Sequence, residues 1–187
     1  MNKIEKCFLE VICGHICGRP GESNLNDLSE EEYELLFKLG EAHSVLPMIF
    51  DSVYESNGFQ QLSQDIKEYV KKKTIASVMN QASHSTQFLE LYRKIIDAGL
   101  NCLVVKGIIC RQMYPKPDYR CSNDEDLYIS KDEFMACHRI LKEQGLKVVN
   151  EKELDNVDNI HVVSYVDTKT GLHIELHQTL FEEDSKA

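Results

Sequence analysis

Residues 120–129 read Arg-Cys-Ser-Asn-Asp-Glu-Asp-Leu-Tyr-Ile, and this stretch decides how the second half of the chain is interpreted. Asp124 and Asp126 are two residues apart and lead into the apolar run 127–129, which is rich in strand-forming residues. In a strand, side chains at positions i and i+2 point to the same face. The two carboxylates are therefore expected to lie together at the start of a strand, where they repel each other unless a cation lies between them.

This pattern favours a divalent cation and a phosphate-bearing ligand, because Mg²⁺ takes oxygen ligands from one or two carboxylates together with substrate phosphates. Asp-x-Asp alone is also common in solvated turns, so the neighbouring sequence has to support the interpretation. Upstream, the apolar run 102–105 ends in Lys106 and Gly107. Downstream, the alternating segment 173–177 places Glu175 and two histidines on one face. Three acids and a Lys-Gly turn thus form one predicted constellation.

The order of these motifs resembles the uncharacterised bacterial nucleotidyltransferases of the polymerase β-like superfamily, and AbiEii-type toxins have a similar arrangement. The resemblance covers residues from about Glu41 to the C-terminus and is sharpest over 106–129. Its segments are Leu-Val-Val-Lys-Gly at 103–107, Tyr-Pro at 114–115, Arg-x-Ser-x-Asp-x-Asp-Leu at 120–127 and His-Ile-Glu-Leu-His at 173–177.

The chain departs from the superfamily pattern in two places. A Gly-Ser pair is common before the acids, and Lys106-Gly107 stands there in this chain. The middle residue of the acid motif is often apolar, and here it is Glu125. Family members also usually continue well beyond the point where this sequence stops, which implies a possible truncation at the C-terminus.

The resemblance implies transfer of a nucleoside monophosphate from a nucleoside triphosphate such as ATP, with Mg²⁺ or Mn²⁺. Two such ions about 4 Å apart clamp the attacking and leaving oxygens of the reaction. Asp124, Asp126 and Glu175 are the expected catalytic and metal-binding residues. The plainer alternative for Glu175 is a solvent-facing strand residue. The acceptor stays open between a small molecule, a protein hydroxyl and an RNA 3′ end.

Four residues are expected at the nucleotide, where each also has a structural alternative. Lys106 and Gly107 precede a predicted helix, whose free amides attract anions, although the pair could be a simple turn. Arg120 could bind phosphate with its planar guanidinium or pair with a nearby aspartate. Ser122 could donate to a phosphate or cap the turn.

Hydrophobic periodicity predicts an α+β fold, with an N-terminal helical portion at 1–99 followed by a nucleotidyltransferase-like core at 100–187 with a small mixed sheet. Helices are expected over 2–17 and 30–42, from Pro47, and over 59–98 in two pieces. The apolar stripe of the second piece comprises Ile75, Val78, Met79, Ala82, Leu89, Tyr92 and Ile96. Strands are expected at 101–105, 124–129, 146–149, 161–166 and 172–176, with helices at 107–113 and from a capping box at 130–133.

Composition narrows the function classes. The net charge of −10 argues against generic nucleic-acid binding, which needs clustered Lys and Arg. No apolar run approaches the roughly 20 residues of a membrane span, and no secretory signal is recognised. Seven scattered cysteines suit reduced, buried thiols in a cytoplasmic protein, and Cys13 and Cys17 are interpreted as core thiols rather than metal ligands.

Three other functions remain open at this level. The first is a non-catalytic nucleotide-binding module of the same fold, which Glu125 and the missing Gly-Ser pair favour slightly. The second is a toxin–antitoxin component that acts through a partner. The third is a metal-dependent phosphohydrolase, because clustered acids and histidines also activate water. Its product would be free phosphate rather than pyrophosphate.

Overall fold

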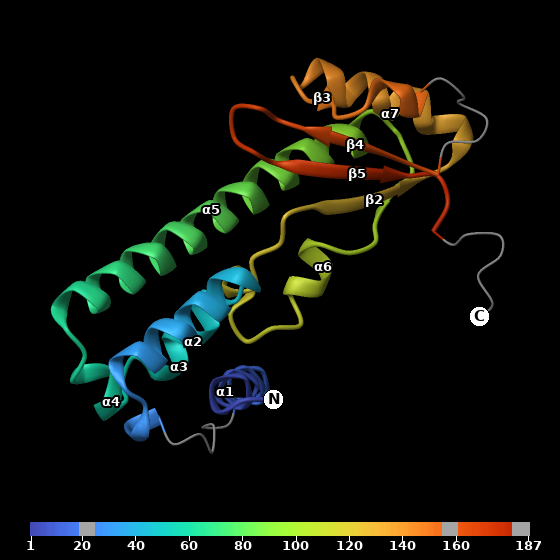
Figure 1. Ribbon diagram of the computed structural model, residues 1–187. Coiled ribbons are helices and arrows are strands. Elements are labelled where there is room, and N and C mark those ends of the chain that lie inside the picture. Colours follow the sequence, from blue (N-terminus) through green and yellow to red (C-terminus); the bar gives the residue numbers. More distant parts are fainter. Residues whose placement is uncertain (19–24, 155–160, 181–187) are drawn as a thin grey trace. The chain divides into compact units, whose positions relative to one another are not determined.

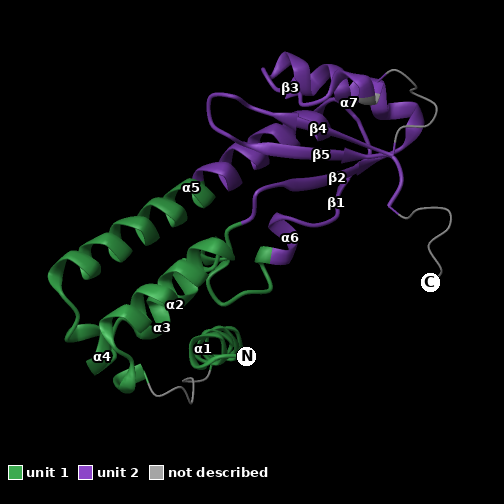
Figure 2. Cartoon of the chain, viewed as in Figure 1, with its two compact units in different colours: residues 1–82, 111–121 green, residues 83–110, 122–187 purple. Residues whose placement is uncertain are grey.

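The computed structural model describes residues 1–18, 25–154 and 161–180. The chain forms two compact units, one of residues 1–82 and 111–121 and the other of residues 83–110 and 122–187 (Figure 2). The helix α5, Gln64–Asp97, contributes residues to both units. The domain boundary that the sequence places at residue 99 stays a prediction. The sequence also predicts a charged, frayed tail from Glu182, and that segment lies outside the described residues.

The first unit is helical, as expected. It contains α1 (Lys3–Cys17), α2 (Glu30–Ala42), α3 (Leu46–Val53), α4 (Asn57–Gln60), the first part of α5, and the short 3₁₀ turns Leu25–Asp27 and Pro117–Tyr119. Pro47 lies in the first turn of α3, where its missing amide hydrogen costs no helical bond. One buried cluster holds these helices together, with Tyr33, Leu36, Phe37, Ile49 and Phe59 among its members.

The segment 111–121 packs within this unit through a small polar cluster. Lys116 pairs with Asp51 at 2.5 Å, and its ammonium lies 5.0 Å from the centre of the Tyr119 ring. His15 stacks on the same ring and lies 3.6 Å from Asp51. Burial lowers the pKa of His15, and the nearby Asp51 carboxylate opposes this shift. These contacts tie the segment to α1 and α3.

The start of α2 forms a capping box, which the pattern Ser29-x-x-Glu32 predicts. The Ser29 hydroxyl accepts from the Glu32 amide at 3.2 Å, and the Glu32 carboxylate accepts from the Ser29 amide at 2.9 Å. The same Ser-x-x-Glu pattern precedes α7 (Lys131–Glu143), but Ser130 makes no capping bond. The Glu133 carboxylate instead accepts from the amide and side chain of Asn101, at 3.2 and 3.1 Å. The capping box predicted at 130–133 is therefore wrong.

These two serines give a stability test with a built-in control. Ser29→Ala is expected to lower the free energy of unfolding by about 1 kcal/mol, because it leaves an α2 amide without its side-chain acceptor. Ser130→Ala removes no capping bond, so it is expected to cost less. Urea denaturation of the two variants measures the difference. Equal losses would show that the hydroxyl of Ser29 does not carry the effect.

Helix α5 buries a different face from the one that its sequence predicts. In the predicted stripe, Met79 is 67% exposed and Leu89 is 52% exposed. The buried side chains of this helix are Val70, Thr74, Gln81, Phe88, Leu91 and Ile95. Both sets recur at helical spacing, so periodicity alone does not choose between them. The packing partners of α5 select the buried set.

The thiol prediction is wrong for two cysteines of α1. Cys13 and Cys17 are exposed, whereas Cys7 is buried. The face of α1 that packs inward carries Ile4, Cys7, Val11 and Gly14. None of the seven cysteines, all of which lie among the described residues, forms a disulfide.

The second unit contains a five-stranded mixed sheet in the order β1-β2-β5-β4-β3 (Figure 1; β1 is labelled in Figure 2). The strands are β1 (Cys102–Val104), β2 (Glu125–Ile129), β3 (Lys147–Val148), β4 (Val162–Val166) and β5 (His173–His177). Neighbours pair antiparallel except β2 and β5, which are parallel. The short helix α6 (Ile108–Arg111) follows β1, and α7 follows β2. The predicted order β-α-β-α-β-β-β and the α+β class are confirmed.

Alternation along β5 gives the sheet one apolar face and one polar face. Ile174 and Leu176 are fully buried, whereas His173, Glu175 and His177 are only partly buried. The apolar face joins one core with α5 and α7, to which these helices contribute Phe88, Leu91, Ile95, Phe134, Cys137 and Leu141. The opposite face is thus free to carry chemistry. Among the described residues, no helix is both long and apolar enough to cross a membrane.

Candidate metal and nucleotide site

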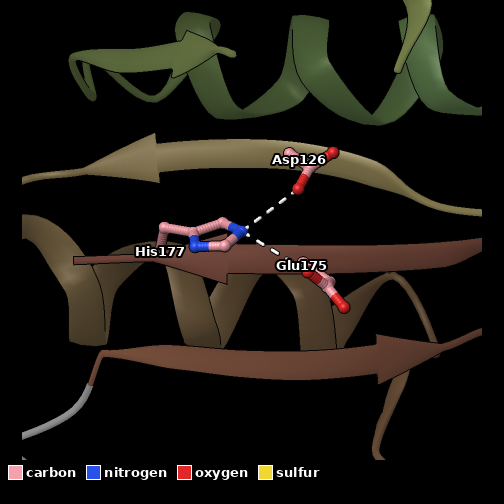
Figure 3. A group of neighbouring side chains, drawn as sticks. All are labelled: Asp126, Glu175 and His177. Carbon is pink, nitrogen blue, oxygen red and sulfur yellow. Dashed lines mark hydrogen bonds and ion pairs between the residues drawn. The ribbon is translucent and has the colours of Figure 1, made fainter. Parts of the chain in front are cut away.

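Two predicted site residues meet on the polar face of the sheet. The parallel pairing of β2 with β5 places Asp126 directly opposite Glu175 (Figure 3). Asp126 is 4% exposed, and Glu175 is partly buried. Paired strands lie about 4.8 Å apart, so side chains on the same face at paired positions are neighbours. Strand register therefore brings these two carboxylates together, although they are 49 positions apart in the sequence.

His177 completes the group. Its Nε2 atom lies 3.2 Å from Asp126 Oδ1 and 3.5 Å from Glu175 Oε2, between the two carboxylates (Figure 3). One ligand atom from each of the three residues lies within 4.8 Å of the others. Across the part of the chain that the structure describes, this is the one group of three or more His, Cys, Asp or Glu residues with such spacing. The sequence predicted that His177 lies on the same face as Glu175, but it did not predict His177 as a site residue.

Lys106 lies beside the same carboxylate. Its Nζ atom is 3.6 Å from Asp126 Oδ1, and its side chain is 68% exposed. The backbone fixes this approach, because the Val105 amide donates to the Asp126 carbonyl at 3.0 Å where β1 ends against β2. An exposed ammonium next to a buried carboxylate offsets part of the cost of burying that charge. It also leaves a cation within reach of a ligand phosphate.

Glu125 explains why glycine follows Lys106. The Glu125 side chain is 2% exposed, and its Oε2 accepts from the Ile108 amide at 2.6 Å. Gly107 has a φ of +59°, and a Cβ built there would lie 2.0 Å from Glu125 Oε2. The carboxylate of Glu125 therefore occupies the start of α6, where the sequence predicted a triphosphate contact. The departure of Glu125 from the superfamily pattern was the available signal.

The remaining predicted residues are not among the three whose ligand atoms converge. Asp124 is half-buried and immediately precedes β2, but it is not one of the three residues whose ligand atoms converge. Ser122 is half-buried and lies in the same unit. Arg120 belongs to the first unit, where its guanidinium carbon lies 5.9 Å from the centre of the Tyr114 ring. The roles of these three residues stay predictions.

Comparison with known proteins identifies the family. The profile of a family described as uncharacterised nucleotidyltransferases matches residues 29–187. The match begins before Glu41, where the sequence resemblance was expected to start, and includes every residue of the candidate site. No curated protein and no solved structure gave a match. The family profile covers well over half of the chain, including both the helices from α2 onward and the whole sheet, and the chain therefore belongs to this nucleotidyltransferase family.

Proposed function

We propose that this chain transfers a nucleoside monophosphate from a nucleoside triphosphate to an acceptor, with a divalent cation held by Asp126 and Glu175. The register of β2 and β5 carries the proposal, because it sets these two carboxylates side by side on the polar face of the sheet. Family membership supports the reaction class. The neighbouring Lys106 supports a phosphate-bearing ligand, since it adds a cation at the edge of the acidic group.

The donor set fits a divalent cation. Three ligand atoms converge within 4.8 Å, and two of them are carboxylate oxygens, which Mg²⁺ and Mn²⁺ both accept. Asp126 is the most buried of the three residues, and burying a carboxylate is costly without a compensating positive charge. Asp126 and Glu175 would hold the cation, and Asp124 is proposed as a further ligand from the start of β2.

The reaction forms one bond to phosphorus and breaks another. An acceptor oxygen bonds to the α-phosphorus and loses its proton, while the bond from the α-phosphorus to the pyrophosphate oxygen breaks. A bound cation supplies charge neutralisation for the phosphate oxygens. Lys106 is proposed to bind the departing pyrophosphate, because its exposed ammonium is free to move from Asp126 onto a phosphate. Ser122 is proposed to position the nucleotide, whereas the nucleotide contacts expected of Arg120 and Gly107 stay predictions.

The acceptor is proposed from three classes: a small molecule, a protein hydroxyl and an RNA 3′ end. The net charge of −10 argues against broad nucleic-acid binding, so an RNA acceptor would have to be recognised specifically. ATP, GTP, CTP and UTP are all candidate donors.

A labelled-nucleotide assay tests the proposal. Each of the four triphosphates, labelled at the α-phosphate, is incubated with the protein, Mg²⁺ or Mn²⁺, and pools of metabolites, protein or RNA. We expect metal-dependent release of pyrophosphate and transfer of the label into one pool. Absence of both with every triphosphate, metal and pool would overturn the proposal.

A metal-dependent phosphohydrolase is the second candidate, and His177 favours it. A mixed carboxylate and imidazole donor set also suits activation of water for attack on phosphorus. The same assay separates the two functions, because this candidate releases free phosphate and leaves no labelled acceptor. Binding of nucleotide without either product would favour a non-catalytic module.

A further inference from the structure

We infer that His177 is a direct ligand of the cation at Asp126 and Glu175, and that its imidazole makes the site prefer Mn²⁺ to Mg²⁺. The inference deepens the proposed function by naming the metal of that site. Metal binding is measured without nucleotide, so it does not depend on the proposed function. Only the catalytic role of the bound metal rests on that function.

The sheet itself determines the position of His177. It lies two residues after Glu175 on β5, and side chains two apart on a strand share a face. Parallel pairing then aligns Asp126 with Glu175 and Tyr128 with His177. The imidazole extends from its own register position back toward the acids, which brings Nε2 to 3.2 Å from Asp126 Oδ1.

The orientation of the ring is compatible with direct ligation. Nε2 rather than Nδ1 faces the two acids, at 3.2 and 3.5 Å (Figure 3). Neutral imidazole carries a lone pair on one nitrogen and a proton on the other. With the proton on Nδ1, the Nε2 lone pair points toward the position on which both carboxylates converge. The side chain of His177 is 19% exposed, so it is partly shielded from water yet reachable by an ion.

The chemistry of the third donor decides between the two metals. Mg²⁺ prefers oxygen ligands and loses its water reluctantly, whereas imidazole is a better ligand for transition metals. Two carboxylates with one imidazole suit Mn²⁺, which accepts oxygen ligands as readily as Mg²⁺ does and also accepts nitrogen. A site of carboxylates alone would give Mn²⁺ no such advantage.

His177 also has an alternative position outside the metal shell, as a donor to Asp126. In that arrangement the ring would hold the carboxylate in place, as groups behind metal ligands commonly do. The distance of 3.2 Å from His177 Nε2 to Asp126 Oδ1 fits the metal-free state of both the ligand and the donor arrangement. A protonated Nε2 would also donate a hydrogen bond to Asp126 Oδ1 at this distance. The two differ in whether nitrogen bonds to the metal, and spectroscopy detects that difference directly.

The test compares His177→Gln with His173→Gln. His173 lies on the same strand and the same face, but it is not in the converging group, so this variant is a matched control for the substitution. Mn²⁺ binding to the full chain is followed by electron paramagnetic resonance without nucleotide, and Mg²⁺ affinity is obtained by competition. Pulsed measurements on the bound Mn²⁺ report coupling to a ¹⁴N nucleus.

We expect the unsubstituted chain to bind Mn²⁺ at least about tenfold more tightly than Mg²⁺ and to show ¹⁴N coupling. His177→Gln should abolish the coupling and weaken Mn²⁺ binding by about 10- to 100-fold, the range seen when groups that support a metal are removed. Its Mg²⁺ affinity should change much less. His173→Gln should keep the coupling and both affinities. Thermal unfolding of each variant without metal confirms that its fold is intact.

Two results would overturn the inference: no ¹⁴N coupling in the unsubstituted chain, or equal weakening of Mg²⁺ and Mn²⁺ binding by His177→Gln. Either result would place His177 outside the metal shell. The proposed function fails separately, because nitrogen-coupled Mn²⁺ without any pyrophosphate release would leave the metal assignment standing and remove the transfer reaction.

Discussion

Asp126→Asn is expected to lower the rate of pyrophosphate release by about 10²- to 10³-fold, a loss typical of removing one group that stabilises transition-state charge. The asparagine keeps the shape of the side chain but removes its negative charge. Asp126 Oδ1 is the atom on which both His177 and Lys106 converge, so this substitution acts at the centre of the group. Divalent-cation binding is expected to weaken in parallel.

A matched variant separates this effect from a general loss of charge. Asp132 is exposed in the first turn of α7, within the same unit but outside the converging group. Asp132→Asn is therefore expected to leave pyrophosphate release and metal binding unchanged. Steady-state assays and metal titrations on the two variants make the comparison. Transfer activity in Asp126→Asn within about threefold of the unsubstituted chain would contradict the proposed mechanism, because that change corresponds to less than 1 kcal/mol.

Gly107→Ala is expected to lower the free energy of unfolding by about 2–5 kcal/mol, the sum of backbone strain and a displaced buried carboxylate. The strain arises because a φ of +59° is unfavourable for a residue with a Cβ. The displacement arises because that Cβ would lie 2.0 Å from Glu125 Oε2 and 3.1 Å from Glu125 Cα. If Glu125 moves, its bond from the Ile108 amide is lost. Chemical denaturation measures the total.

Gly99→Ala provides the control for strain alone. Gly99 has a φ of +79°, but nothing lies within 4 Å of the position that its Cβ would take. This variant is expected to lose only about 1–2 kcal/mol, the cost of the left-handed backbone. Repeating Gly107→Ala in a Glu125→Ala background should recover part of the larger loss, since the carboxylate is then absent. Equal losses in the two glycine variants would show that contact with Glu125 contributes nothing.

The sequence by itself determined the local elements and their order. The capping box at Ser29, the proline that starts α3 and Gly99 after α5 are short-range signals that act through neighbouring backbone groups. The hairpin between β4 and β5 is of the same kind, with Gly171 at a φ of +79° in its turn. Such features form in any context that leaves the local backbone free to adopt them.

The sequence also predicted the group of acidic residues, because the order of its motifs resembles that of the family. It identified Asp126 and Glu175 correctly as neighbours. It could not establish the approach of His177, since alternation assigns a face to a residue but not the register of one strand against another. The hydrogen bonds of β2 with β5 determine that register.

Only the tertiary structure decided the features that depend on residues distant in the chain. Ser130 and Ser29 begin the same sequence pattern, yet Glu133 bonds to Asn101 and the second capping box does not form. Helix α5 carries two sets of residues at helical spacing, and its packing partners bury the set that includes Phe88. Local sequence determines what an element is. The residues that pack against it in the fold determine which of its hydrogen bonds form and which of its faces is buried.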